Sequence, residues 1–350
     1  MADHPPEKGI SIILPMRDER LLARQKIEEV ILEIKDSNHE EIIVIDSGSV
    51  DGTGEIARNT LQESSLPKNR WEVISSDFPG KTRAINLGVS IANFEIIVMM
   101  DADAICTPGW LSVCYEIFTN SEIGLACGIE NFEDQNYLKS SEKMYKSISN
   151  RRRLRQSNKS SIVIAEGSLC CFRRSCLANN PLDDRYNADD TQITLICSRN
   201  NLRSIMSPSL EFRDNPDNSR GDNFWRRVRR GRGITNALLR NLDLALPRNN
   251  QINPKEFRNT ASLYLIAPWI PVVFLSLCLS IYSEIYNADF LPKNEILAII
   301  IFPLLLICFS SNFIRSYLLG CLIMVLAQIS SLTNSGKDAW NTDRSENYVR

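Results

Sequence analysis

Histidine is nearly absent from this sequence, since only His4 and His39 occur among its 350 residues. Neither lies in a neighbourhood suited to catalysis, so acid–base or metal chemistry must fall to carboxylates. The N-terminal segment MADHPPEKGI is polar and has no apolar signal core. Nothing in it is expected to send the first part of the chain across a membrane.

The chain also lacks an excess of basic charge, because its formal net charge is -2 at pH 7. A nucleic-acid-binding domain normally shows a broadly basic surface, whereas the two basic runs here, Arg151–Arg153 and Arg226–Arg232, are local. We therefore expect no nucleic-acid partner.

The ten cysteines contain no CxxC pair and no zinc-site spacing. Only Cys170 and Cys171 are adjacent, and Cys278, Cys308 and Cys321 lie within apolar stretches. This placement argues against a small disulfide framework and predicts reduced, mostly buried thiols.

Short apolar runs alternate with helical patterns in the first hundred residues. The runs resemble buried strands at Gly9–Pro15, Glu41–Asp46, Trp71–Ser75 and Phe94–Met100, and the helical patterns cover Glu19–Lys35, a segment from Thr53 onwards, and Lys81–Ala92. This alternation predicts an α/β fold with a mainly parallel sheet. Ligands of such sheets bind beyond the carboxyl ends of the strands, and Asp46 and Asp101 both stand at strand ends.

The region from Trp110 to Arg220 is less regular. A strand is expected at Ile162–Phe172 and a helix at Asp190–Arg199. A basic amphipathic helix is then expected from Gly221 to about Leu246. Its arginines suit either the diphosphate of a nucleotide or an anionic lipid surface, and the sequence leaves both roles open.

Three apolar stretches follow, at Ser262–Tyr282, Ile296–Phe313 and Ser316–Leu332. A bilayer core about 30 Å thick needs about 20 apolar helical residues, so the first stretch qualifies well and the other two are near the lower limit. The basic residues before the first stretch predict a multi-pass protein of the cytoplasmic (inner) membrane with its N-terminal domain in the cytosol. The third stretch is the weakest, and a re-entrant or interfacial placement of it stays open.

Two carboxylates, Asp101 and Asp103, directly follow the expected strand Phe94–Met100. At this spacing both can reach one hard cation, Mg²⁺ or Mn²⁺, which in turn can neutralise the phosphates of a nucleoside diphosphate. A lone DxD is also common in solvated turns. A phosphatase with an aspartate nucleophile is disfavoured, because Ile105 stands where its hydroxyl residue would be.

Four segments in order resemble the signature of family-2 glycosyltransferases, which have the GT-A fold. They are Ile12–Glu19 (IILPMRDE), Val44–Thr53 (VIDSGSVDGT), Gly80–Gly88 (GKTRAINLG) and Asp101–Asp103 (DAD). Gly167–Arg174 further resembles the acceptor-side glycine segment of that family, and Ala188–Gln192 its acidic general-base motif. The resemblance covers about Gly9 to Gly233. The apolar stretches are similar to those of membrane-bound, polysaccharide-assembling (succinoglycan-type) members.

The resemblance implies roles for individual residues. It puts Pro15, Arg17 and Glu19 in the nucleotide pocket, Asp46 near the nucleobase, and Lys81 near the ribose or phosphates. Asp101 would meet the ribose or the metal, and Asp103 would bind the metal directly. From the residues alone, Glu19 fits equally well as a carboxylate at a helix start, and Ser47–Thr53 fits a turn with a capped helix.

Asp190 aligns with the general base of the family, which would take the proton from an acceptor hydroxyl. The family often has Glu before the base and another acid two residues after it, where this sequence has Asp189 and Gln192. The Asp189–Asp190 pair also fits a helix start. In the arginine-rich segment Phe224–Gly233 only Arg229 matches the QxxRW pattern of processive synthases. That departure argues against a processive polymerase and leaves Arg229 as a candidate for binding the donor.

These observations predict an inverting, metal-dependent glycosyltransferase with a UDP-sugar as the expected donor and a glycolipid or other lipid-linked or saccharide acceptor hydroxyl. The expected domains are a catalytic domain at 1–221, a basic interfacial segment at 222–260, two to three membrane helices at 261–333 and a polar tail at 334–350. Transfer onto a polyprenyl phosphate is the enzymatic alternative, and a nucleotide-binding scaffold without activity is the other.

Overall fold

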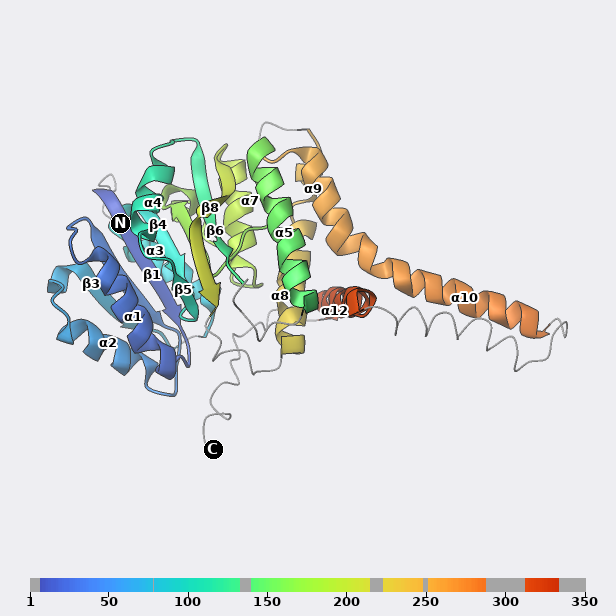
Figure 1. Cartoon of the computed structure of the whole chain (residues 1–350), viewed down its shortest axis with the longest axis horizontal. Helices are drawn as coiled ribbons and strands as arrows, with labels where there is room; N and C mark the ends of the chain where they lie inside the picture. Colours follow the sequence, from blue (N-terminus) through green and yellow to red (C-terminus); the bar gives the residue numbers. More distant parts are fainter. Residues whose placement is uncertain are drawn as a thin grey trace.

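One eight-stranded sheet with the order β3-β2-β1-β4-β7-β6-β8-β5 organises the N-terminal part of the chain. Helices cover both of its faces, and apolar helices extend from one side (Figure 1). The structure is a computed structural model and describes residues 7–77, 79–132, 140–214, 223–247, 251–287 and 312–333.

The first half of the sheet follows the sequence prediction closely. Its elements are β1 (Glu7–Met16), α1 (Arg20–Ile34), β2 (Glu40–Asp46), α2 (Thr53–Glu63), β3 (Trp71–Ser75), α3 (Lys81–Ile91) and β4 (Phe94–Met100). Strand β1 pairs in parallel with both β2 and β4, and β2 pairs in parallel with β3. The carboxyl ends of these four strands therefore share one edge of the sheet.

The second half is mixed, so the prediction of a mainly parallel sheet is wrong there. Its elements are β5 (Ala104–Cys106), α4 (Trp110–Phe118), β6 (Ile123–Glu130), α5 (Ser140–Lys159), β7 (Leu169–Arg173), α6 (Ser175–Ala178), α7 (Asp189–Arg199) and β8 (Arg203–Asp214). Strand β7 runs antiparallel to β4 and β6, β5 runs antiparallel to β8, and only β6 and β8 are parallel.

The strand expected at Ile162–Phe172 is shorter than predicted, because β7 begins only at Leu169. Ile162, Val163 and Ala165 are irregular but almost fully buried. Their apolar character thus reflects burial in the core and not strand formation.

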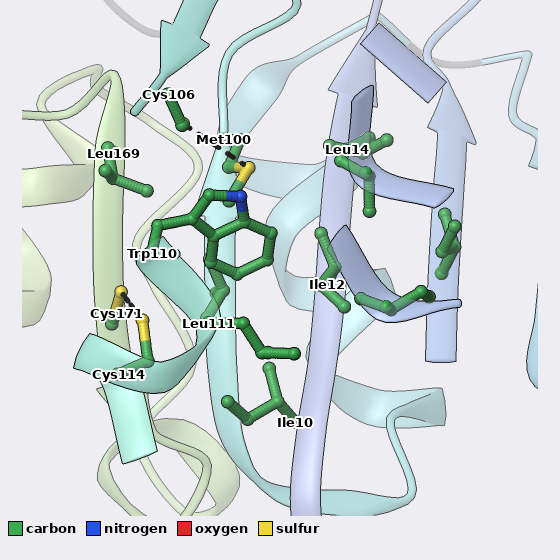
Figure 2. Close-up of a cluster of buried hydrophobic side chains, with 14 of the residues drawn as sticks. Ile10, Ile12, Leu14, Met100, Cys106, Trp110, Leu111, Cys114, Leu169 and Cys171 are labelled. Carbon is green, nitrogen blue, oxygen red and sulfur yellow. Dashed lines mark hydrogen bonds between the residues drawn. The ribbon is translucent and has the colours of Figure 1, made fainter. Parts of the chain in front are cut away.

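Alternate side chains of β1 enter two separate cores, as its two-residue period requires. Ile10, Ile12 and Leu14 join Trp110 of α4 in a cluster that α1 and α2 also line, while Ile13 faces α3, α6 and α7 on the other side. Figure 2 shows the first cluster, in which the sulfurs of Cys114 and Cys171 lie 3.2 Å apart. Every cysteine in the described part of the chain is free, and all but Cys278 are buried.

The C-terminal elements are α8 (Asn223–Leu239), α9 (Pro254–Ala261), α10 (Ile270–Asn287) and α12 (Asn312–Thr333). A π-helical turn at Ser262–Ile266 and a 3₁₀ turn at Ala267–Trp269 connect α9 to α10. Two helices, Pro254–Ser280 and Ile314–Leu332, are long and apolar enough to cross a membrane, with mean hydropathies of 2.0 and 1.5. The third apolar stretch forms a continuous helix, whereas the second lies almost entirely outside the described residues.

A buried lysine supports the strand that follows Asp103. The Nζ of Lys26, whose residue is 1% exposed, donates to the carbonyl of Ala104 at 2.8 Å and to Glu29 at 3.3 Å. Glu29 in turn accepts from the amide of Cys106 at 2.8 Å. Helix α1 therefore anchors both ends of β5.

Removing this ammonium should destabilise the protein. We expect Lys26→Met to lower the free energy of unfolding by about 3 kcal/mol, because the buried carbonyl of Ala104 loses its donor and the half-buried carboxylate of Glu29 loses its ion-pair partner. Denaturant unfolding of the full chain in detergent measures the change. Lys35→Met at the exposed end of α1 is the matched control, and an equal loss in both variants would contradict the assignment.

Candidate active site

The loops that leave β1 and β2 are tied into one unit by side chains. The amide of Asp18 donates to Ser49 Oγ at 3.0 Å, and its carboxylate accepts from the amide of Val50 at 2.9 Å. The amide of Glu19 donates to Thr53 Oγ1 at 2.8 Å. These bonds stabilise Asp18 at a φ of 52°, and they fix the floor of the site on this side.

Asp46 lies inside this unit at the end of β2. Its Oδ1 accepts from the amide of Ser49 at 3.1 Å, and a Cβ added to Gly54 would lie 2.3 Å from its Oδ2. A side chain at position 54 would therefore displace the carboxylate. Pro15 is buried within β1 opposite Ile45, one strand position before the loop begins.

Arg17 carries unsatisfied donors. Its Nε and Nη1 atoms are buried and have no hydrogen-bond acceptor among the described residues, although Nε lies 3.7 Å from the Asp18 carboxylate. A buried donor without an acceptor costs about 1–3 kcal/mol, and more when the group is charged. The guanidinium is therefore suited to an anionic or acceptor-rich ligand at this edge.

Lys81 joins two segments that are far apart in the sequence. It opens α3, and its Nζ lies 2.7 Å from Oδ1 of Asp101 after β4 and 3.4 Å from Oδ2 of Asp189 at the start of α7. Burial alone would lower the pKa of Lys81, but the charges of Asp101 and Asp189 raise it. The lysine is therefore held as a cation in the centre of the site.

Asp190 stands next to this ion-pair network. Its Oδ1 accepts from the amide of Thr191 at 2.6 Å, and a Cβ at Gly167 would lie 3.0 Å from its Oδ2. Burial first, and then the charges of Asp189 and Glu166, raise its pKa to about 7. A carboxyl group with this pKa can accept a proton near neutral pH, which general base catalysis needs.

The donor set at Asp101 and Asp103 fits a hard divalent cation. Both side chains are partly exposed at the end of β4, and carboxylate oxygens are the ligands that Mg²⁺ and Mn²⁺ prefer. Within the described residues no group of three or more His, Cys, Asp or Glu side chains is placed to hold a metal. Two carboxylates match the way in which Mg²⁺ is commonly bound, with the other oxygens from substrate phosphates and water.

The structure adds residues that sequence reasoning missed. Burial lowers the pKa of Arg230 on α8, and the charges of four carboxylates raise it by more: Glu166, Asp101, Asp103 and Asp214. Asp214 is brought there because it pairs with Ala104, the residue after Asp103. Arg230 lies in the arginine run that the sequence singled out, but no local signal points to Glu166 or Asp214.

The sequence-predicted residues thus gather along one edge of the sheet. Arg17 directly follows β1, Asp46 ends β2, and Lys81 contacts both Asp101 and Asp189. Asp103 lies within electrostatic reach of Arg230. Glu19 is buried and directly precedes α1. The role of Arg229 on α8 stays a prediction.

Two family models match the sequence. The model described as "Glycosyl transferase family 2" matches residues 11–179, and "Glycosyl transferase family group 2" matches residues 96–332. Together they include every candidate site residue and the described apolar helices.

Curated relatives are similar over a shorter range. Glycosyltransferase AglE of Haloferax volcanii is 28% identical over 125 residues, 35% of this chain and 40% of the relative. Probable glycosyltransferase YdaM of Bacillus subtilis is 27% identical over 106 residues, 30% of this chain and 25% of the relative. The alignments therefore span well under half of these relatives.

Among solved structures, a mannosyltransferase (PcManGT) from Pyrobaculum calidifontis, in complex with GDP-Man and Mn²⁺, is similar with a TM-score of 0.70 and 20% identity over 94% of this chain and 91% of that chain. TarS of S. aureus is similar with a TM-score of 0.52 and 11% identity over 75% of this chain and 44% of that chain. At these identities the likeness shows the fold, an α/β GT-A-like arrangement.

Proposed function

This chain belongs to the family-2 glycosyltransferases, and we propose that it transfers a sugar from a nucleoside-diphosphate sugar to an acceptor hydroxyl with inversion. The observation that carries the proposal is the meeting of Lys81, Asp101 and Asp189 in one ion-pair network beside Asp190. Residues from three separate segments converge there. They bring together the ammonium of Lys81, the carboxylate of Asp101 that belongs to the proposed metal pair, and the candidate base Asp190.

The donor is proposed to lie along the edge formed by β1, β2 and β4. Arg17 has two buried nitrogen atoms, Nε and Nη1, without a hydrogen-bond acceptor in the described structure. Asp46, at the end of the neighbouring strand, accepts a hydrogen bond from the amide of Ser49. Lys81 and Arg229 supply positive charge for the diphosphate. Pro15 lies in β1 just before the first loop, and Glu19 lies just before α1. A UDP-sugar is the expected donor, and the likeness to a structure that contains GDP-Man makes a GDP-sugar the second candidate.

Asp101 and Asp103 are proposed to hold Mg²⁺ or Mn²⁺ together with the donor phosphates. When bound, the ion supplies positive charge against the departing diphosphate. The likeness to a GT-A structure that contains Mn²⁺ supports this proposal. Lys81 bonds to Asp101 at 2.7 Å, so its ammonium is positioned to add charge on the same side.

Asp190 is proposed to take the proton of the acceptor hydroxyl while its oxygen bonds to the anomeric carbon. The proton then resides on the Asp190 carboxylate, and the electron pair of the glycosidic bond leaves with the diphosphate. Attack opposite the leaving group inverts the configuration. The raised pKa of about 7 makes Asp190 a stronger base than an ordinary aspartate while leaving much of it ionised at neutral pH.

The acceptor is proposed to be a glycolipid or another lipid-linked saccharide in the assembly of a cell-surface polysaccharide or glycan. Two apolar helices adjoin the catalytic domain, and a site beside a bilayer can reach an acceptor held in it. The proposed location is the cytoplasmic membrane with residues 1–221 in the cytosol, followed by the segment 222–260, membrane helices in 261–333 and the tail 334–350. Transfer onto a polyprenyl phosphate is the alternative, which Asp190 can test.

Turnover of labelled nucleotide-sugars tests the function. We expect the full chain in bilayer nanodiscs to release nucleoside diphosphate from one member of a panel of UDP- and GDP-sugars, and to label a lipid-extractable product when Mn²⁺ or Mg²⁺ is present. The Asp103→Ala variant in the same nanodiscs is the blank. Nucleotide binding without turnover of any donor, in the presence of lipid extracts from several cell types, would instead support a scaffold.

A further inference from the structure

Two glycines interrupt the middle of α8, the helix that carries Arg230. Gly231 and Gly233 lie well inside Asn223–Leu239, where glycine weakens a helix relative to alanine. Residues two apart on a helix point about 200° from one another, so the two glycines mark opposite faces. Each face makes a close contact that a side chain would obstruct.

Gly231 faces the apolar helix α12. A Cβ at this position would lie 3.0 Å from the Cβ of Ala327 and 3.0 Å from the sulfur of Met324. The surrounding contact is apolar and buried, since Val228 of α8 clusters with Ile323 and Ala327 of α12. Figure 1 shows α8 and α12 next to each other at the lower end of α5.

Gly233 faces the turn that leads into the candidate base. A Cβ there would lie 2.6 Å from the carbonyl oxygen of Asn187 and 3.1 Å from the Cβ of Ala188. Ala188 has a φ of 80°, which costs energy for any residue with a Cβ and persists only where its surroundings hold it. Asp189 and Asp190 follow directly.

The same helix is firmly embedded in the catalytic domain beyond these contacts. Ala237 and Leu238 are fully buried in a cluster with Tyr186 and Leu195, which flank the base turn on either side. Arg230, directly before Gly231, feels the charges of Asp101 and Asp103. One helix therefore packs against the apolar helix and the base turn, and its Arg230 interacts electrostatically with the carboxylate pair.

We propose that α8 positions the catalytic groups from its contact with α12, so that Gly231 and Gly233 are positioning residues for the transfer reaction. Close packing at Gly231 sets how deeply α8 lies against α12, and close packing at Gly233 holds the backbone of Asn187 and Ala188, which aims Asp190. The inference rests on the proposed function. It adds that the apolar helix α12 helps to position the active site.

The first test is Gly231→Ala in the full chain in nanodiscs. Alanine strengthens an isolated helix, so a loss of activity cannot come from weakened helix formation. A misplacement of about 1 Å can cost about 10²-fold, and a shift of a few tenths of an ångström should lower kcat by about 10-fold at most, with little change in the donor KM. The matched control is Gly320→Ala in α12, where an added Cβ meets nothing within 4 Å.

Adding Ala327→Gly to Gly231→Ala removes the opposing Cβ and leaves only the flexible side chain of Met324 close to the new methyl group. The kcat should therefore recover toward that of Ala327→Gly alone, which completes a double-mutant cycle. No second substitution can relieve Gly233→Ala, because its neighbour is the backbone carbonyl of Asn187. We expect this variant to lose about 10²-fold in kcat. Absence of recovery in the double variant, or donor KM values that change as much as kcat, would overturn the proposal.

Deuterium exchange of the backbone amides in 183–194 gives a second readout that does not need activity. We expect faster exchange in Gly231→Ala and Gly233→Ala than in wild type and Gly320→Ala, with recovery when Ala327→Gly is added to Gly231→Ala. If the wild type transfers no sugar but this exchange pattern is found, the proposed function fails and the positioning role stands. Unchanged exchange in both glycine variants overturns the positioning role whatever the activity is.

Discussion

Asp103→Ala is expected to abolish sugar transfer while leaving the protein folded. If Asp101 and Asp103 hold the cation that neutralises the departing diphosphate, the loss is several kcal/mol of charge stabilisation in the transition state. That loss corresponds to a rate lower by about 10³-fold or more. The fold should tolerate the change, because Asp103 lies in a partly exposed turn between β4 and β5, and β5 is anchored separately by Lys26. Product formation over a series of Mn²⁺ concentrations measures it.

A carboxylate far from the site supplies a control for this variant. Asp36→Ala removes one exposed carboxylate beyond the end of α1, at the opposite edge of the sheet, and should retain the wild-type rate. Nucleotide affinity in Asp103→Ala should lose its dependence on the cation but keep the part that is independent of it. Full transfer by the wild type in excess chelator, or a near-normal rate of Asp103→Ala, would show that the metal assignment is wrong.

The first half of the fold could be predicted because each of its strands and helices shows its own pattern of apolar residues in the sequence. Strands β1, β2 and β4 are buried on both faces, so they read as continuous apolar runs. Helices α1 and α3 begin and end within one residue of the predicted bounds, and α2 begins at the predicted Thr53. Asp46 and Asp101 could be placed at the ends of these strands because carboxyl ends of neighbouring parallel strands share an edge.

The second half could not be predicted because its pairings are long-range. Strand β5 has three residues and exists only through its pairing with β8, and β8 itself includes Pro208. A periodicity search cannot find a three-residue strand, and it cannot tell that Asp214 will stand opposite Ala104. That pairing brings Asp214, one of the four carboxylates whose charges act on Arg230. The motif in the sequence therefore points to Arg229 and not to its neighbour Arg230.

Asp190→Asn is expected to lower the rate of transfer by about 10²- to 10⁴-fold with nucleotide affinity nearly unchanged. Asparagine keeps the shape of the side chain and can still accept from the amide of Thr191, but it cannot take the acceptor proton. Steady-state kcat and donor KM, together with equilibrium binding of the nucleoside diphosphate, measure the change. A polyprenyl phosphate acceptor is already ionised and has no proton to lose, so near-normal transfer by Asp190→Asn would favour that alternative.

The pH dependence and Asp189→Asn complete the test. With its pKa raised to about 7, Asp190 acts only when deprotonated, so the wild-type rate should rise with pH through about 7 and then level off. Asp189→Asn removes a charge that raises this pKa and releases Lys81 from its 3.4 Å ion pair, and both effects favour the ionised form of Asp190. The rising part of the pH–rate profile should therefore move to lower pH, and the plateau rate of Asp189→Asn should fall less than that of Asp190→Asn. Equal and severe losses in both variants, together with lost nucleotide binding, would show that the pair is structural.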